Sequence, residues 1–147
     1  MANIVAICIS EKKGVGKTQI EEINLIEEFG LENDAHGGKW HRQVSLLEKE
    51  KIEDFIARGG KVKYGDFGEN FVTEGLDLEK IQVGDKITIG DSLLEITQKG
   101  KQCHVKCNIF KMVGDCIMPK NGVFARVLKG GHVKIGEEIQ DRKSTRL

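Results

Sequence analysis

The chain lacks a hydrophobic run long enough to span a membrane, and its first residues, MANIVAICIS, contain neither a cationic leader region nor a cleavage site. It also lacks net charge, since 23 Lys and Arg residues balance 23 Asp and Glu residues. That balance provides no general attraction to nucleic acid or to a membrane surface, so an anion site would need a local concentration of charge. We therefore expect a cytoplasmic protein that has neither nucleic acid nor a membrane as a partner.

Proline is nearly absent, with one residue in 147, whereas glycine occurs 18 times. Turns made by glycine suit tight hairpins better than disordered linkers, and no low-complexity segment interrupts the chain. The length favours one domain with a sizeable core. We place this single domain at residues 1–140 and expect the polar stretch 141–147 to fray.

Hydrophobic spacing predicts mostly strands. The apolar, β-branched run 4–10 is typical of a buried strand, while residues 19–29 fit either a helix or an alternating strand. Two hairpins are predicted, the first from residues 87–96 around Gly-Asp-Ser and the second from residues 123–139 around Gly130-Gly131. In both, a turn with glycine separates two short apolar segments, as a hairpin requires.

One helix is predicted in the first half of the chain. Ser45 and Glu48 have the spacing of a capping box, and Gly59-Gly60 would end the helix. Between them, an apolar stripe is formed by Ile52, Phe55 and Ile56.

Two short segments, 83–87 and 135–139, share one pattern: an apolar residue, glycine, an acidic residue, a variable residue and isoleucine. Coincidence in a glycine-rich chain is one interpretation. Repeated turns of this kind between short strands otherwise favour a closed or strongly curved sheet. The expected fold is mainly β, a barrel-like antiparallel sheet with a few short helices.

The stretch GVGKT at residues 14–18 follows an apolar strand, as a nucleotide-binding P-loop does. That motif requires a glycine where this chain has Glu11, whose carboxylate would repel phosphate. The hairpins of the second half also do not fit the parallel sheet of a P-loop domain. We favour the alternative, a basic turn that exposes Lys12, Lys13 and Lys17 to solvent.

Basic residues surround Cys103. No acidic side chain occurs between Glu95 and Asp115, and the interval contains Lys99, Lys101, His104, Lys106 and Lys111. Positive neighbours favour the thiolate, which is the nucleophilic and metal-binding form of cysteine. Residue chemistry leaves three interpretations open: a reactive or metal-ligating Cys103, a zinc site that combines Cys103, Cys107, Cys116 and a histidine, or small hydrophobic residues.

For Cys8, inside the apolar run, we favour the role of a small hydrophobic residue. A second candidate site is the loop that contains His36, His41 and Arg42. Their side chains can donate hydrogen bonds to an anion, and Gly37-Gly38 would let a ligand approach the backbone. Exposed loop histidines with Trp40 as a structural anchor are the alternative.

Four segments, in this order, resemble MOSC domains, which are named for the C-terminal domain of molybdenum cofactor sulfurase: GLENDAHGGKWHRQVSLL, GDFGENFVTEGL, VGDKITIGDSLLEITQKGKQC and GDCIMPKNGVFARVLKGG. The resemblance runs from about Asn3 to Ile139. It implies a barrel akin to the β-barrel domain of pyruvate kinase and a link to molybdenum cofactor (molybdopterin). The family's characteristic cysteine falls on Cys103, which would carry sulfur as a persulfide or ligate molybdenum.

The resemblance also implies roles for other residues and for partners. Cofactor contacts would come from His36, His41, Arg42, Asn70, Lys101 and His104. As a sulfur carrier, Cys103 would receive sulfur from a cysteine desulfurase, which would itself hold pyridoxal phosphate; no such site is expected in this chain. As a molybdenum-dependent reductase of N-hydroxylated compounds, the protein would need an electron-donor partner, because the chain has no flavin, haem or iron–sulfur motif. A non-catalytic zinc or anion-binding module is the third possibility.

The chain departs from the family pattern in two places. Asn33-Asp34 stands where many members have Gly-Asp, and Lys99-Gly100-Lys101-Gln102 replaces a Pro- and Arg-rich approach to the cysteine. Lysine keeps the positive charge but lacks the bidentate fork that arginine offers to phosphate.

Overall fold

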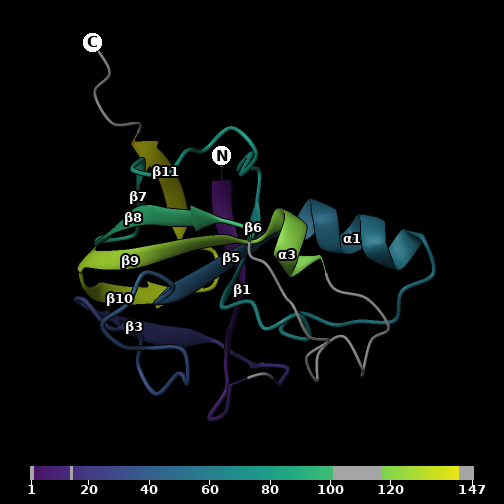
Figure 1. The fold of residues 1–147 in the computed structure, drawn as a ribbon, viewed down its shortest axis with the longest axis horizontal. Coiled ribbons are helices and arrows are strands. Elements are labelled where there is room, and N and C mark those ends of the chain that lie inside the picture. Colours follow the sequence, from purple (N-terminus) through teal and green to yellow (C-terminus); the bar gives the residue numbers. More distant parts are fainter. Residues whose placement is uncertain (1, 14, 101–116, 143–147) are drawn as a thin grey trace.

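The computed structural model describes residues 2–13, 15–100 and 117–142, and its main element is one curved sheet of eight strands (Figure 1). These strands are β1 (Ala2–Ile9), β2 (Thr18–Ile20), β5 (Val44–Glu48), β6 (Phe71–Glu74), β7 (Lys86–Ile89), β8 (Ser92–Lys99), β9 (Val123–Lys129) and β11 (Glu138–Arg142). Their order is β11-β7-β8-β9-β5-β6-β1-β2, and β11 also pairs with β1. This last pairing closes the sheet into a barrel, and the expected mainly β, barrel-like fold is confirmed.

One pair of strands departs from the antiparallel sheet that the sequence predicts. Strands β5 and β6 run parallel, and the helix α1 (Lys49–Ala57) lies on the connection between them. A parallel pair needs such a crossover, because a tight turn can join only antiparallel neighbours. The barrel is therefore mixed rather than antiparallel.

Helix α1 is confirmed, but its predicted capping box is wrong. Ser45 and Glu48 belong to β5, and Glu48 occupies the N-cap position without a side-chain capping bond. The predicted end is correct, since the Gly59 amide bonds to a carbonyl of the last turn and Gly59 has φ 101°. Ile52 and Phe55 face the core beside β5 and β6.

A smaller sheet contains β3 (Glu22–Ile26), β4 (Gly30–Leu31) and β10 (Gly131–Lys134), in the order β10-β3-β4. Burial alternates along β3, with Ile23 and Leu25 inside, so the ambiguous residues 19–29 form the end of β2, then β3 and a turn at 27–29, rather than a helix. The predicted second hairpin is wrong, because β9 pairs with β5 and β8 while β10 pairs with β3. Gly130 permits this change of sheet, since a Cβ there would collide with the Leu25 carbonyl oxygen.

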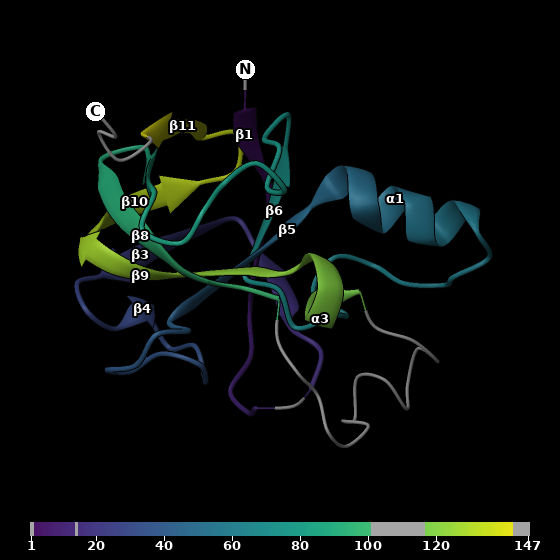
Figure 2. The same cartoon turned by 45° about the horizontal axis from the view of Figure 1, so that its top comes forward.

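The first hairpin and the repeated pattern both have structural counterparts. Strands β7 and β8 form the predicted hairpin. The repeated segments place Gly84 (φ 95°) and Gly136 (φ 92°) just before β7 and β11, which pair with each other. Figure 2 shows β11 beside β1, its other partner. Strand β11 continues to Arg142, so the polar stretch from residue 141 begins inside the sheet rather than beyond it.

Two apolar clusters form the core. The larger fills the barrel and includes Ile7, Leu46, Phe71, Ile87 and Leu94, all fully buried. The smaller lies between the barrel wall and α1, and a second short helix, α3 (Met118–Asn121), contributes Met118 to it. No helix in the described part of the chain is long and apolar enough to cross a membrane.

Candidate functional site

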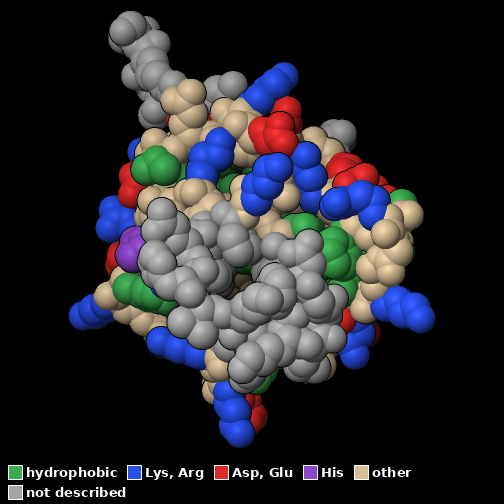
Figure 3. Space-filling view, turned by 45° about the vertical axis from the view of Figure 1, so that its right-hand side comes forward, with side chains coloured by type: hydrophobic (Ala, Val, Ile, Leu, Met, Phe, Trp, Pro, Cys, Tyr) green, Lys and Arg blue, Asp and Glu red, His purple; other side chains and the backbone are tan. Residues whose placement is uncertain are grey.

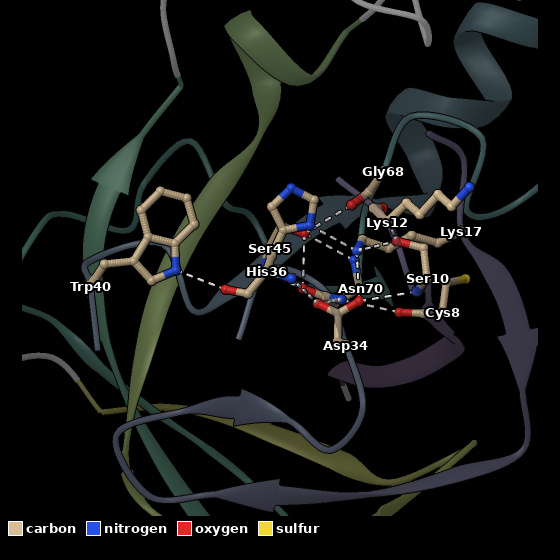
Figure 4. A network of polar contacts seen from close by, with 10 residues as sticks. All are labelled: Cys8, Ser10, Lys12, Lys17, Asp34, His36, Trp40, Ser45, Gly68 and Asn70. Carbon is tan, nitrogen blue, oxygen red and sulfur yellow. Dashed lines mark hydrogen bonds and ion pairs between the residues drawn. The ribbon is translucent and has the colours of Figure 1, made fainter. Parts of the chain in front are cut away.

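A network of buried polar side chains joins segments that are far apart in the sequence (Figure 4). Lys17 lies directly before β2, Asp34 and His36 lie on the loop after β4, and Asn70 lies directly before β6. Hydrogen bonds connect Lys17 to Asp34 and Asp34 to Asn70. These loops therefore meet beside one end of β1.

Lys17 does not point into solvent, so the predicted exposed basic turn is wrong at this residue. Its side chain has 0% exposure, and Nζ lies 2.7 Å from Asp34 Oδ1. Burial lowers the pKa of Lys17, and the nearby Asp34 carboxylate opposes that shift. Lys12 and Lys13 are exposed as predicted.

Asn70 is buried and positions Asp34. Its Nδ2 donates to Asp34 Oδ2 at 3.1 Å and to the Cys8 carbonyl oxygen at 3.1 Å. Its Oδ1 accepts from the Ser45 amide at 2.9 Å. The side chain that the sequence assigned to cofactor binding thus lies behind the loop, where it links β1, β5 and that loop.

Trp40 brings the three predicted loop residues together. Its Nε1 donates to the His36 carbonyl oxygen at 2.7 Å, and its ring stacks near the His36 imidazole. The Arg42 guanidinium lies over the Trp40 ring at 4.7 Å, and the exposed His41 contacts that ring edge-on. The anchoring role considered for Trp40 and the clustering of the histidines and Arg42 therefore coexist.

The Arg42 side chain in this cluster has a hydrogen-bond donor that is not satisfied. Its Nε is buried and has no hydrogen-bond partner among the described residues. The guanidinium also contacts a second aromatic ring, since its Cζ lies 5.6 Å from the centroid of the Phe124 ring on β9. Cation–π contacts of this kind hold the plane of the guanidinium group, whose N–H groups can only donate hydrogen bonds.

A cavity of about 640 Å³ adjoins the cluster. It is lined by Glu28, Lys39, Trp40, His41, Val83, Gly84, Glu95, Ile96, Thr97 and Arg126. The Thr97 hydroxyl donates to the His41 carbonyl oxygen, which ties the loop to β8 at the cavity wall. A small ligand bound at the Trp40 cluster would thus have open volume beside it.

Glu69, in the Gly-Glu-Asn motif, is fully buried, and its two oxygens accept from the Gly65 and Phe67 amides. Burial raises its pKa from 4.5 to about 7, against the effect of those amides. Burial, followed by the charge of Glu69, raises the pKa of Cys8 to about 12. Cys8 is thus an inert buried thiol, in agreement with the sequence prediction.

Sequence reasoning missed Lys17, Asp34 and Ser10 as parts of the site. The GVGKT stretch did single out Lys17, but as a failed P-loop residue. Asp34 was noticed only as the neighbour of Asn33, the residue that departs from the family's Gly-Asp pattern, and no local signal marks Ser10. Their importance comes from contacts across loops that spacing in the sequence does not reveal.

Cys103, Lys101 and His104 lie outside the described residues, as do Cys107 and Cys116. On either side of that segment, β8 ends at Lys99 and α3 begins at Met118, and the Gly100 amide donates to the Gly122 carbonyl oxygen at 2.6 Å. The two flanks of the cysteine segment are therefore joined at the β8–β9 side of the barrel. Phe124, which contacts Arg42, lies opposite Gln98 in that pair.

Charge on the described surface is mixed. Figure 3 shows Lys and Arg side chains interspersed with Asp and Glu on one face rather than gathered in one basic patch. Among the described residues, no group of three or more His, Cys, Asp and Glu side chains is arranged to hold a metal ion. Any anion site here therefore depends on particular donors such as Arg42.

A family model described as MOSC domain matches residues 33–140. The chain belongs to the MOSC domain family. This match confirms the resemblance carried by the four sequence segments, and the MOSC family is associated with molybdenum cofactor. A search of the curated proteins finds no match.

Solved structures share this MOSC fold. The YuaD protein from Bacillus subtilis matches with a TM-score of 0.79 and 16% identity, covering 99% of this chain and 98% of that chain. YiiM from Geobacillus stearothermophilus matches with a TM-score of 0.72 and 20% identity over 96% of this chain and 75% of that chain. YiiM from Escherichia coli has a TM-score of 0.66 and 19% identity, over 99% and 71% of the two chains. Identities this low establish the fold alone.

Proposed function

We propose that this MOSC domain binds molybdenum cofactor through the Trp40 cluster, with Arg42 as the principal donor to the anionic phosphate of the pterin. The observation that carries the proposal is the buried Arg42 Nε without a partner among the described residues. A buried donor left unpaired costs about 1–3 kcal/mol, so a ligand oxygen that accepts from it gains that amount on binding. His36 and His41 add donors around the same indole ring.

The residues present fit such a group in a second respect. The described residues hold no cluster of metal-ligating side chains, and a cofactor that brings its metal together with its own ligands would not need one there. A dithiolene cofactor would bring its metal in this way, and a protein thiolate would add a further ligand. When bound, the cofactor would supply two-electron redox chemistry at molybdenum.

We assign the thiolate role to Cys103, which follows the described end of β8. Lys101 and His104 would favour its ionised form, since positive neighbours lower the pKa of a thiol. Two activities follow from this assignment. In the first, the Cys103 thiolate would accept the outer sulfur of a persulfide on a cysteine desulfurase, and the desulfurase cysteine would leave as a thiolate. In the second, Cys103 would ligate molybdenum in a reductase of N-hydroxylated compounds that receives electrons from a partner.

Metal and pterin content test the proposal. Protein purified from cells that make molybdenum cofactor should release molybdenum and pterin on denaturation, and Arg42→Ala should reduce both. Arg58→Ala is the matched control, because Arg58 is a 65% exposed side chain directly after α1 whose ion pair is with Asp54 of that helix. Equal cofactor content in Arg42→Ala and in the wild type would overturn the assignment of Arg42.

Cys103→Ser separates the remaining alternatives. Loss of molybdenum with pterin retained would support ligation by Cys103. If neither is present, an added sulfur on Cys103 after incubation with a desulfurase and cysteine would support the carrier. Zinc retained by the wild type and lost in Cys107→Ala would instead support the structural zinc module and contradict cofactor binding.

A further inference from the structure

The Lys17 ammonium group has one acceptor for each of its three N–H bonds. Nζ lies 2.7 Å from Asp34 Oδ1, 3.2 Å from Ser10 Oγ and 2.9 Å from His36 Nδ1. An ammonium group only donates hydrogen bonds. His36 Nδ1 must therefore act as an acceptor, which means that it carries no proton.

The neighbours of Lys17 support this direction of donation. The Ser10 hydroxyl gives its single proton to the Lys12 carbonyl oxygen at 2.9 Å, so its oxygen can accept from Lys17. Asp34 accepts from the Ser10 amide at Oδ1 and from the His36 amide at Oδ2. A carboxylate that accepts at both oxygens beside an ammonium group is ionised.

The orientation of the Asn70 side-chain amide determines which of its atoms faces Asp34 Oδ2. Its Oδ1 accepts from the Ser45 amide, and its Nδ2 donates to the Cys8 carbonyl oxygen. These two backbone groups have fixed roles, so the amide cannot be reversed without losing both bonds. The Nδ2 therefore donates to Asp34 as well, which fixes the direction of the hydrogen bond on this side of the carboxylate.

The imidazole ring of His36 is also held in place. Its backbone is fixed at the amide by Asp34 and at the carbonyl by Trp40 Nε1. The indole lies nearly parallel to the imidazole, at an interplanar angle of 11° and a centroid separation of 6.5 Å. Position, ring plane and proton location are thus set before any ligand binds.

We propose that Lys17 is a positioning residue that holds His36 in the neutral tautomer with its proton on Nε2, so that His36 presents an N–H donor to an anionic oxygen of the ligand. A ring held in this form cannot accept a hydrogen bond at Nε2, so it discriminates against ligands that donate at that point. The identity of the ligand rests on the proposed function, whereas the tautomer follows from the network alone.

Nitrogen-15 NMR of the imidazoles tests the tautomer in the intact protein. The His36 signals can be identified by their loss in His36→Gln, since the chain has 4 histidines. In the wild type we expect an unprotonated Nδ1 and a protonated Nε2. A proton on Nδ1 would overturn the proposal, whatever ligand the protein binds.

Removing Lys17 should release the tautomer. In Lys17→Met/Asp34→Asn, which removes both buried charges together, the two His36 nitrogens should shift toward the averaged values of exchanging tautomers. Lys12→Met is the control, because its exposed side chain lies outside the network while its carbonyl oxygen is retained. An unchanged His36 spectrum in the double variant would show that Lys17 does not set the tautomer.

Inorganic phosphate probes the donor. Phosphate should shift the His36 Nε2–H resonance saturably in the wild type and in Lys12→Met, and bind roughly tenfold more weakly to the double variant. No shift in the wild type would contradict the anion-facing role.

The failure of this inference can be told apart from the failure of the proposed function. If the tautomer is as expected while no cofactor copurifies, only the proposed function fails. Should cofactor copurify while Nδ1 is protonated, only the present inference fails.

Discussion

Lys17 Nζ lies 2.7 Å from Asp34 Oδ1, and both side chains have 0% solvent exposure. When two opposite charges are buried, only their mutual attraction and further hydrogen bonds can compensate for the hydration that both have lost. Here Ser10, His36 and Asn70 supply those bonds. The loops before β2 and after β4 are consequently held together by one ion pair rather than by apolar packing alone.

Removing one member of this pair should be costly. Lys17→Met leaves a buried carboxylate unpaired, and we expect the free energy of unfolding to fall by about 3–5 kcal/mol. The double variant Lys17→Met/Asp34→Asn, which removes both charges, should recover part of this lost stability. Denaturant unfolding measures both. The exposed pair Lys51–Glu79, at a similar 2.8 Å, is the comparison, and Lys51→Met should change the free energy of unfolding little. Equal losses at the two lysines would contradict a role for burial.

Asn70→Asp should place a second carboxylate beside Asp34 without changing the size of the side chain. Because Asn70 Nδ2 lies 3.1 Å from Asp34 Oδ2, the substitution exchanges a hydrogen bond for repulsion between like charges. We expect a loss on the order of 3 kcal/mol at pH 8, which becomes smaller on acidification as one carboxyl takes up a proton. Asn24→Asp, at an exposed asparagine also near a carboxylate, should change stability little. A loss independent of pH would argue against repulsion.

Glu69 should make the protein less stable as pH rises toward neutrality. Its folded-state pKa of about 7 exceeds the ordinary value of 4.5, so between these values the native state binds more protons than the unfolded chain. The contribution of Glu69 to the free energy of unfolding is therefore most favourable below about pH 4.5. It falls by roughly 3 kcal/mol as the pH rises through 7.

Glu69→Gln isolates this effect. The variant loses one acceptor toward the Gly65 or Phe67 amide, which lowers stability at every pH. The stability advantage of the wild type over Glu69→Gln should nevertheless shrink between about pH 4.5 and 7. Unfolding free energies measured in this window check the slope, and a constant difference would mean that Glu69 titrates at its ordinary value.

Gly65→Ala should be far more damaging than Gly59→Ala. Both glycines have positive φ, 96° and 101°, so both substitutions carry backbone strain of about 1 kcal/mol. A Cβ at Gly65 would also collide with the Lys17 carbonyl oxygen, whereas a Cβ at Gly59 meets open space. We expect Gly65→Ala to lower thermal stability by several kcal/mol beyond the control. Similar melting temperatures for the two variants would show that the Lys17 turn can move.

Arg42→Lys should weaken ligand binding although it keeps the charge. Lysine has no Nε–H donor in a fixed plane and stacks less well on the rings of Trp40 and Phe124. We expect at least about a tenfold loss of affinity for inorganic phosphate. Trp40 is the single tryptophan, so its fluorescence reports binding without a label. Arg58→Lys is the control, and equal affinities in the two variants would exclude a special role for the Arg42 plane.

Much of the architecture was readable from local patterns. Alternating and β-branched segments predicted β1, β7 and β8, and glycine placement predicted where α1 ends. Ordered motifs predicted the MOSC family, and a loop with two histidines and Arg42 predicted a cluster that Trp40 does assemble. These features depend on neighbours in the sequence, so a period of two residues or a short motif is sufficient to reveal them.

Only the tertiary structure decided which elements and side chains meet. β10 joins β3 instead of β9, and β5 runs parallel to β6, because the backbone partners of each strand lie far away in the sequence. Lys17 looks like a surface lysine until the fold places Asp34 against it and Asn70, 36 residues further along the chain, against Asp34. Burial and pairing of charge depend on the enclosing fold, and for that reason the direction of each hydrogen bond around His36 could be assigned only from the assembled barrel.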